Sequence, residues 1–281
     1  AEAQVVAATC LGTSDAVLAR RAFDVCIIDE ASQITVPTCL GPLRLADRFV
    51  MIGDHHQLTP LVRDTDAAQH GMSVSLFQRL CKAHPSSVAM LCTQYRMNAD
   101  IMALSNALVY EGRLVCGNES VACAKFTMKR DACPSWLWDV LDPARPAVFV
   151  DTDAVKAVES RADTLEEKRV EAEWIVSRSD VLIQANVAAA DIGILTPYRQ
   201  QAKLLRDRCA CEVLTVDQAQ GRDWPVVLVS LVRSNKTHTV GELLRDQRRV
   251  NVMITRAKTK LVLVGSYSTM IHGPCTEPIP A

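Results

Sequence analysis

Several features that would indicate a membrane, secreted or metal-bound protein are missing from this sequence. No apolar run approaches the roughly 18 residues that cross a bilayer. The amino terminus, AEAQVVAATC, lacks a basic segment followed by a long apolar core, so it does not predict a signal peptide. The 11 cysteines include no CxxC pair, and an odd number without a framework is typical of a reducing compartment. We therefore expect a soluble intracellular protein that uses no membrane.

Two further absences concern nucleic acid and nucleotide. A net charge of −1 excludes a generally basic coat, so any contact with nucleic acid must come from local patches. No GxxxxGK[ST] loop, whose backbone amides would cradle phosphates, occurs in the 281 residues. The length predicts about two domains. The sequence starts without Met and almost directly in an expected strand, residues 5–9, so we interpret it as a fragment.

The chain is organised around residues 24–60, which contain two similar stretches. FDVCIIDEASQ and RFVMIGDHHQLTP each begin with a short apolar run and continue into a polar cluster. Such runs predict parallel strands that are buried on both faces. In open α/β sheets, ligands bind outside the carboxyl ends of the strands. The pattern therefore predicts that two carboxylates and a glutamine meet at one sheet edge.

Those residue types suit phosphoryl transfer from a nucleotide. Asp29 can hold Mg²⁺, usually through water, because that ion keeps most of its hydration shell. Glu30 can orient or deprotonate the attacking water, and Gln57 can sense the γ-phosphate. The alternative is that Asp29 and Glu30 only end a strand as a solvated turn.

Strands and helices alternate through the rest of the chain, which predicts an α/β fold with two mainly parallel-sheet domains, residues 1–90 and 91–281. We expect further strands at residues 88–92, 148–150, 192–195, 213–216, 226–232 and 261–264. Helices are expected at residues 72–82, after an Asn98 cap, after a capping box at Thr164, from Thr196-Pro197 and over residues 241–258. Residues 111–146 show no periodicity, and no chemistry is assigned to them.

The second half supplies arginines and one glycine-containing turn. Arg96 follows an expected strand, and Arg256 lies near the end of the last long expected helix. Either arginine can stabilise charge on a γ-phosphate as an arginine finger does, whereas the alternative for Arg256 is a solvated helix end. Gly221 and Asp223 could approach a ribose or phosphate, although such turns are common.

Taken in order, these motifs resemble those of superfamily 1 helicases, in the group that contains the RNA-surveillance and the eukaryotic replication helicase–nucleases. DEAS, GDHHQLTP, QYRM, LTPYRQQ, VDQAQGRD and NVMITRAK stand in the family's order, and the resemblance runs from about residue 3 to 268. It is strongest to the replication helicase–nucleases through NALVYEGRLVCG, LVSLVRSN and GELLRDQRRVNVMITRAK. The resemblance implies two RecA-like domains of the P-loop NTPase type, the first of them incomplete.

The resemblance also implies roles for individual residues. ATP and Mg²⁺ would be the cofactors, with Asp29 on the metal and Glu30 activating water. Gln57, Arg96 and Arg256 would contact the γ-phosphate. Tyr95 would stack on adenine, and Asp223, beside Gly221, would meet the ribose. The residues that would grip the nucleic-acid backbone are Thr9, Thr196, Pro197, Tyr198 and Thr215.

Three departures from the family pattern qualify this interpretation. Ala219 replaces a usual aromatic residue, Met253 replaces a usual alanine, and the P-loop is missing. We therefore expect the carboxyl-terminal motor part of an ATP-dependent DNA helicase that moves on single-stranded or flap DNA. An upstream nuclease domain with an iron–sulfur cluster would be absent from this chain. The alternatives are an RNA helicase and a non-catalytic module that binds nucleic acid or a partner. The implied location is the nucleus, with the mitochondrion as a second possibility.

Overall fold

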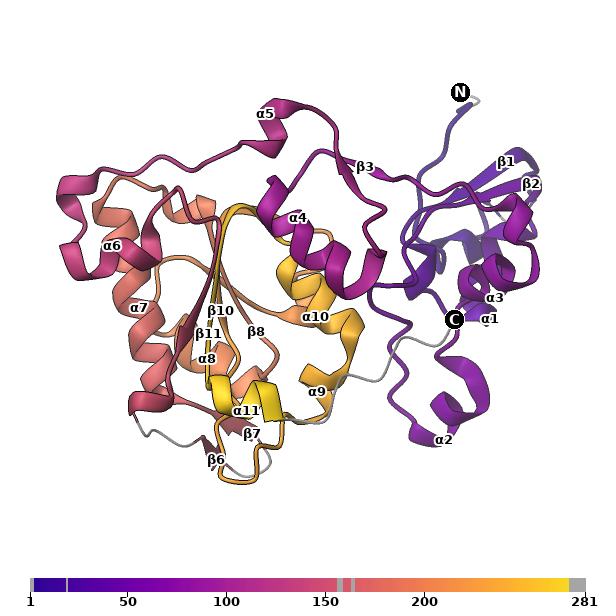
Figure 1. Cartoon of the computed structure of the whole chain (residues 1–281). Helices are drawn as coiled ribbons and strands as arrows, with labels where there is room; N and C mark the ends of the chain where they lie inside the picture. Colours follow the sequence, from indigo (N-terminus) through magenta and orange to yellow (C-terminus); the bar gives the residue numbers. More distant parts are fainter. Residues whose placement is uncertain (1–2, 19, 156–158, 163–164, 273–281) are drawn as a thin grey trace. The chain divides into compact units, whose positions relative to one another are not determined.

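The computed structural model describes residues 3–18, 20–155, 159–162 and 165–272 (Figure 1). These residues divide into two compact units. The first unit ends at Met90, and the second begins at Leu91. Each unit is described separately.

The first unit is built on a pair of strands with short helices. In chain order its elements are a 3₁₀ turn at Gly12–Ser14, β1 (Phe23–Ile28), a 3₁₀ turn at Ala31–Gln33, α1 (Val36–Leu43), β2 (Ala46–Met51), α2 (Thr65–Ala67), a π-helical turn at Ala68–Met72, α3 (Leu76–Ala83) and a 3₁₀ turn at Pro85–Ser87. β1 and β2 run parallel, with Cys26 opposite Phe49 and Ile28 opposite Met51. Both carboxyl ends therefore lie at one edge, as the sequence predicts.

The burial of these strands differs from the prediction. Ile27 is 67% exposed and Val50 is 50% exposed, so the pair is not buried on both faces. The cause is that its apolar cover is small, a cluster around Ile28 and Cys39. The expected strand at residues 5–9 is also wrong. This segment forms no ladder, and Val5 is 86% exposed, because an apolar run becomes a strand only where another strand pairs with it.

The second unit contains the larger sheet. Its strands are β3 (Thr93–Gln94), β4 (Val115–Cys116), β5 (Ala147–Asp151), β6 (Ser160–Ala162), β7 (Leu165–Glu167), β8 (Ile192–Thr196), β9 (Glu212–Thr215), β10 (Trp224–Ser230) and β11 (Ala257–Gly265). Its α-helices are α4 (Ala99–Ser105), α5 (Glu119–Ala122), α6 (Ser135–Leu141), α7 (Arg169–Gln184), α8 (Arg199–Arg206), α9 (Glu242–Arg245), α10 (Gln247–Ile254) and α11 (Tyr267–His272). A π-helical turn at Asn106–Tyr110 follows α4, and 3₁₀ turns lie at Arg130–Ala132, Asp153–Val155, Ala189–Asp191 and Val216–Gln218.

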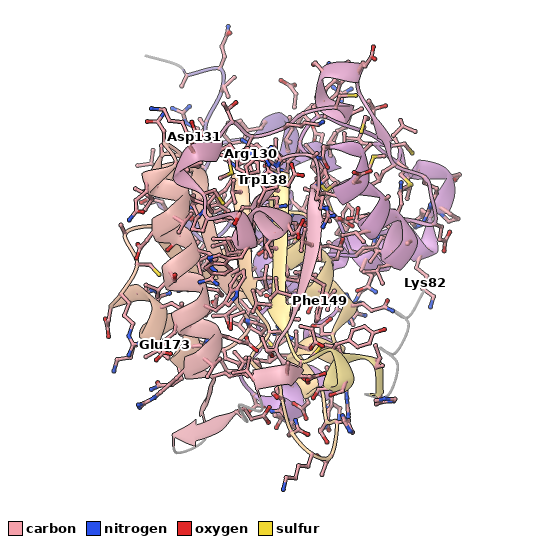
Figure 2. All side chains as sticks on the ribbon, turned by 60° about the vertical axis from the view of Figure 1, so that its left-hand side comes forward. Lys82, Arg130, Asp131, Trp138, Phe149 and Glu173 are labelled. Atoms are coloured by element: carbon pink, nitrogen blue, oxygen red, sulfur yellow. The ribbon has the colours of Figure 1, made fainter. Side chains whose placement is uncertain are left out.

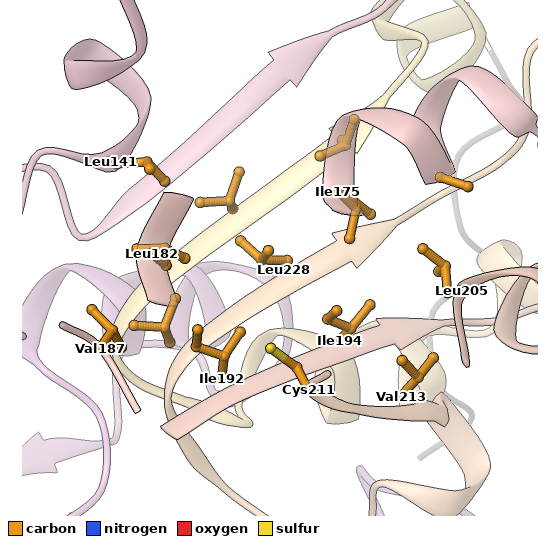
Figure 3. Packing of buried hydrophobic residues seen from close by; sticks show 14 of the residues in the cluster. Leu141, Ile175, Leu182, Val187, Ile192, Ile194, Leu205, Cys211, Val213 and Leu228 are labelled. Carbon is orange, nitrogen blue, oxygen red and sulfur yellow. The ribbon is translucent and has the colours of Figure 1, made fainter. Parts of the chain in front are cut away.

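Five of these strands form one parallel sheet in the order β5-β11-β10-β8-β9. Helices α6, α7 and α8 lie on one side of this sheet, and α4 and α10 lie on the other (Figure 1). Ile194, Leu228 and Val262 pack with Ile175 and Leu205 of the helices in a buried cluster (Figure 3). All five residues of β8 are buried, as the uninterrupted apolar run predicts. The predicted α/β fold with parallel sheets is confirmed.

Several predicted boundaries in this unit are wrong for local reasons. Residues 88–92 form no strand, and the ladder begins only at Thr93. Thr164 lies outside the described residues, and Leu165–Glu167 forms β7 against β6 instead of the first turn of a helix. Pro197 is not the first helical residue, because α8 begins at Arg199. The expected helix over residues 241–258 is interrupted at Asp246, whose side chain caps α10 by accepting from the Arg248 amide.

The irregular segment 111–146 carries a surface of stacked cations and rings. The Arg130 guanidinium lies 4.7 Å from the ring centroid of Trp138 (Figure 2). The Arg178 guanidinium of α7 lies over the rings of Trp136 and Trp174, at 4.6 and 4.7 Å from their centroids. The contact with Trp136 ties the segment to α7 without a regular pattern in the sequence. Within the described part of the chain, no helix has the length and apolar character to cross a membrane.

Candidate functional site

The DEAS turn places two carboxylates beyond the carboxyl end of β1. Asp29 is exposed, and its Oδ1 accepts the Glu30 amide at 2.9 Å. Glu30 has a φ of +51°, a left-handed conformation that is uncommon outside glycine. Its Oε2 accepts from the Gln33 side chain at 3.0 Å. Such backbone is concentrated at functional sites, which makes this turn a candidate site, but it is not unique to it, because Glu111, Asn186, Val232 and His238 also have a positive φ.

The turn after β2 lies directly against the DEAS turn. The Ile52 amide donates to the Ile28 carbonyl at 2.8 Å, and the Ala31 amide donates to the Ile52 carbonyl at 2.9 Å. A Cβ on Gly53 would lie only 3.0 Å from the Ser32 amide nitrogen, so a side chain there would force the two turns apart. The two polar clusters therefore meet as predicted, and backbone atoms of the two turns make the contact.

Gln57 is held within its own turn by a residue that the sequence analysis did not single out. Its Nε2 donates to Asp54 Oδ2 at 2.9 Å, and the other oxygen of Asp54 accepts the His56 amide at 2.9 Å. Asp54 follows Gly53 and precedes His55 in the polar cluster after the second strand, and this position is the signal in the sequence that could have identified Asp54. Asp54 therefore sets the direction of the Gln57 amide.

The first unit fits a magnesium ion that is bound mainly through water. No group of three or more His, Cys, Asp or Glu side chains that could hold a metal occurs among the described residues. Mg²⁺ is usually held by one or two carboxylates together with water and substrate phosphates. Asp29 is an exposed carboxylate of this kind, so a nucleotide would have to supply the remaining ligands.

A charge cluster lies within the second unit. Asp223 accepts from Arg96 Nε at 3.3 Å and from Lys258 Nζ at 2.5 Å. Burial raises the pKa of Asp223, but the hydrogen bond and charge of Lys258, with the charge of Arg96, lower it by more, so the pKa lies below its ordinary value. Arg96 Nη1 also donates to the Thr255 carbonyl at 3.4 Å. Lys258 lies two residues after Arg256 in the motif NVMITRAK, and the sequence alone assigned it no role.

Arg256 is buried, with 1% of its surface exposed. Its Nε donates to the Val252 carbonyl at 3.0 Å, Nη1 to the Arg222 carbonyl at 3.3 Å and Nη2 to Thr255 Oγ1 at 2.8 Å. The alternative of a solvated helix-end arginine is therefore wrong. The residue lies between α10 and β11, because the expected long helix ends at Ile254. Thr255 joins Arg256 to the Arg96–Asp223–Lys258 cluster: its hydroxyl accepts from Arg256, and its carbonyl accepts from Arg96.

Tyr95 and Gly221 are exposed, whereas Arg256 is buried. Tyr95 is 67% exposed, so its ring is available for stacking. Gly221 has a φ of +78°, and a Cβ there would meet nothing within 4 Å. The backbone conformation, not lack of space, therefore requires glycine at this turn. Asp223, two residues later, is already paired with two cations.

The residues assigned to the nucleic-acid backbone are divided between the units. Thr196 and Thr215 are register partners at the carboxyl ends of β8 and β9. Both side chains are buried: Thr196 Oγ1 accepts the Tyr198 amide at 3.3 Å, and Thr215 Oγ1 donates to Gln218 Oε1. Pro197 is also buried, whereas Tyr198 is partly exposed. Thr9 is exposed in the first unit, and its hydroxyl accepts the Gly12 amide.

Comparison with known proteins places this arrangement in a family. Two family models, each described as an AAA domain, match residues 1–65 and 72–268. The chain belongs to the AAA-domain family. Its AAA-domain match from residue 72 covers the whole five-stranded sheet and the Arg96–Asp223–Lys258 cluster.

Curated relatives of this AAA-domain chain include enzymes of DNA replication. The DNA replication ATP-dependent helicase/nuclease JHS1 of Arabidopsis thaliana is 46% identical over 279 residues, which cover 97% of this chain and 21% of the relative. The corresponding DNA2 protein of Homo sapiens is 47% identical over 291 residues, which cover 97% of this chain and 27% of the relative. The chain thus spans about a quarter of these relatives. The recognised resemblance to the replication helicase–nucleases is confirmed.

Among solved structures, the chain matches the crystal structure of Arterivirus nonstructural protein 10 (helicase). It is 16% identical, covers 85% of this chain and 38% of that chain, and has a TM-score of 0.41.

Proposed function

We propose that this AAA-domain chain is the carboxyl-terminal motor part of an ATP-dependent DNA helicase of the replication helicase–nuclease type. The observation that carries the proposal is the backbone contact between the DEAS and GDHHQ turns at the carboxyl edge of β1 and β2. That contact brings the carboxylates of Asp29 and Glu30 to the same edge as Gln57, which is the set of groups that ATP hydrolysis needs.

Each residue of the first unit has a separate task in this proposal. Mg²⁺ would neutralise charge on the phosphates of bound ATP, with Asp29 holding its water shell. Glu30 takes a proton from the attacking water, and its carboxylate is held by the Gln33 side chain in the same turn. Gln57, oriented by Asp54, donates to or accepts from the γ-phosphate region.

The second unit supplies the base platform and positive charge. Tyr95 stacks on adenine with its exposed ring. Arg96 and Arg256 stabilise charge at the γ-phosphate. Asp223 holds Arg96 in an ion pair, and with Gly221 it lines the ribose side.

Single-stranded or flap DNA is the proposed substrate of the motor, and the nucleus its proposed location. Thr196 and Thr215 lie side by side at the carboxyl ends of β8 and β9, where a phosphate chain can pass. Both hydroxyls are engaged within the protein, and the Thr215 and Tyr198 amides donate to Gln218 Oε1 and Thr196 Oγ1. We therefore assign the contact to the partly exposed side chain of Tyr198 in preference to the threonines. An iron–sulfur cluster would belong to a nuclease domain and not to the residues of this sequence.

A non-catalytic binding module is the second candidate, and the missing GxxxxGK[ST] loop favours it for the chain alone.

We expect residues 1–281 to hydrolyse ATP negligibly and a polypeptide that adds a P-loop upstream of residue 1 to show DNA-stimulated turnover. The experiment compares the two in steady-state ATPase assays with single-stranded DNA, flap DNA and RNA of equal length. A longer polypeptide that stays inactive would contradict the motor proposal, and stronger stimulation by RNA would overturn the choice of DNA.

A further inference from the structure

Tyr95 lies in a turn whose conformation is held by its neighbours. The side-chain oxygen of Gln94 accepts the amides of Arg96 and Met97, both at 2.8 Å, and its Nε2 donates to the Met97 carbonyl at 2.8 Å. The Asn98 amide donates to the Lys258 carbonyl at 2.9 Å, which ties the turn to the start of β11. The backbone on both sides of Tyr95 is therefore fixed, and only the direction of its ring remains to be set.

Gly117 lies against this ring. β3 and β4 are parallel partners, and the Gly117 amide donates to the Gln94 carbonyl at 2.8 Å (β3 is labelled in Figure 1). A Cβ on Gly117 would lie 2.1 Å from Tyr95 Cε1 and 2.5 Å from both Cδ1 and Cζ. Cδ1 and Cζ are the ring atoms bonded to Cε1. Because the Cβ would be equally far from these two atoms, and only slightly farther from them than from Cε1, the glycine lies over the face of the ring and not at its edge. One face of Tyr95 is thus covered, although the side chain is 67% exposed.

Space, not backbone conformation, requires glycine here. Gly117 is outside the left-handed region, unlike Gly112 with a φ of +75°. Ordinary contact of a Cβ begins at 3.4 Å, so an alanine methyl at position 117 would displace the ring by about 1.3 Å, the difference between 3.4 and 2.1. Because Tyr95 is mostly exposed, the ring can swing into solvent without disturbing the core. The fold survives this change, but the ring leaves its position.

We propose that Gly117 is a positioning residue for nucleotide binding: its missing side chain forms a flat seat for one face of Tyr95, so that the opposite face receives the base. This inference rests on the proposed function, because it assumes that Tyr95 stacks on adenine. It assigns a role within residues 111–146, the segment to which the sequence analysis assigned no chemistry.

The test is a double-mutant cycle in the P-loop-bearing polypeptide, with steady-state ATP hydrolysis and thermal unfolding measured for each variant. Base–aromatic stacking is worth ~1–3 kcal/mol, so Tyr95→Ala should raise the KM for ATP roughly 5- to 150-fold. Gly117→Ala should also raise KM at least about fivefold, with kcat and melting temperature nearly unchanged. In the Tyr95→Ala background, Gly117→Ala should have no further effect, because no ring remains to be displaced.

Two controls make the outcomes distinct. Tyr95→Phe keeps the ring and should retain the wild-type KM in the presence of Gly117. Gly112→Ala strains the backbone where a Cβ meets nothing within 4 Å, so it should lower the melting temperature and leave KM unchanged. If Tyr95→Ala leaves KM unchanged, the adenine role in the proposed function fails. If Tyr95→Ala raises KM but Gly117→Ala does not, or if their effects add, only the positioning role of Gly117 is overturned.

Discussion

Replacement of Arg256 tests whether its burial serves structure alone or also chemistry. In Arg256→Ala three acceptors lose a donor, namely the Val252 and Arg222 carbonyls and Thr255 Oγ1. A buried polar group left without a partner costs ~1–3 kcal/mol. The Val252 carbonyl still accepts from the Thr255 hydroxyl at 3.3 Å, which offsets part of the loss. We therefore expect a decrease of ~2–4 kcal/mol in the free energy of unfolding.

Activity should decrease by much more than stability explains. Loss of an arginine finger costs ~10³–10⁵ in rate, whereas a folded but destabilised enzyme assayed well below its melting temperature loses little. Arg256→Lys keeps the charge but not the planar fork, so it should recover little of the activity. Arg245, exposed at the end of α9, provides the matched control: Arg245→Ala should change stability by less than ~0.5 kcal/mol and leave turnover unchanged.

The assay pairs urea unfolding of each variant with steady-state ATP turnover of the P-loop-bearing polypeptide at a temperature where all variants are folded. Near-wild-type turnover in Arg256→Ala, with the expected loss of stability, would show that the buried arginine is structural and would refute the finger role. Unchanged stability would instead refute the hydrogen-bond reasoning.

Three further changes test other parts of the structure. Glu30→Gln should leave ATP binding nearly intact while hydrolysis falls ~10²–10⁴-fold, because an amide cannot take the proton; binding and turnover measured separately would show whether Glu30 is only structural. Gly193→Ala should lower the free energy of unfolding by ~1–3 kcal/mol, since its Cβ would lie 2.4 Å from the Trp224 ring, and urea unfolding would reveal an error if it were silent. Burial lowers the pKa of Lys260 to about 8, below its ordinary 10.5, so the unfolded chain binds the extra proton between these values and this lysine adds stability as pH rises across that window. The thiols of Cys39 and Cys211 act in the opposite direction above their ordinary pKa of 9, because burial raises the pKa of both to about 11. Lys260→Met should therefore make the slope of stability against pH less positive in unfolding experiments from pH 7.5 to 10.5, and an unchanged slope would contradict the assignment.

The large sheet could be predicted from sequence because its strands satisfy the pattern on which such predictions rest. β8 and β10 are nearly continuous apolar runs and are buried on both faces, so composition and burial agree. The expected strand at residues 5–9 is also mainly apolar but pairs with no strand among the described residues, and pairing is a property of the fold that a local window does not contain. The same applies to Leu165–Glu167, where pairing with β6 outweighs the helix-cap signal.

The candidate site shows the same limit. The positions of Asp29, Glu30 and Gln57 at one edge follow from parallel strands, which local patterns predict. The burial of Arg256 does not, because one of its acceptors, the Arg222 carbonyl, is 34 residues away in the chain. Lys258 and Gly117 were likewise missed, since their roles depend on Asp223 and on Tyr95, neither of which is a neighbour in sequence.

The contact between the two turns of the first unit has a consequence for how its carboxylates are held. The Ala31 amide, directly after Glu30, donates to the Ile52 carbonyl, directly before Gly53. A displacement of the second turn therefore acts on Glu30 through backbone atoms, without a side chain that could rotate to absorb it. Because a Cβ at Gly53 would lie 3.0 Å from the Ser32 amide nitrogen, this position cannot take a side chain without such a displacement. The backbone of Glu30 is thus held both by its own turn and, through Ala31, by the turn that carries Gln57.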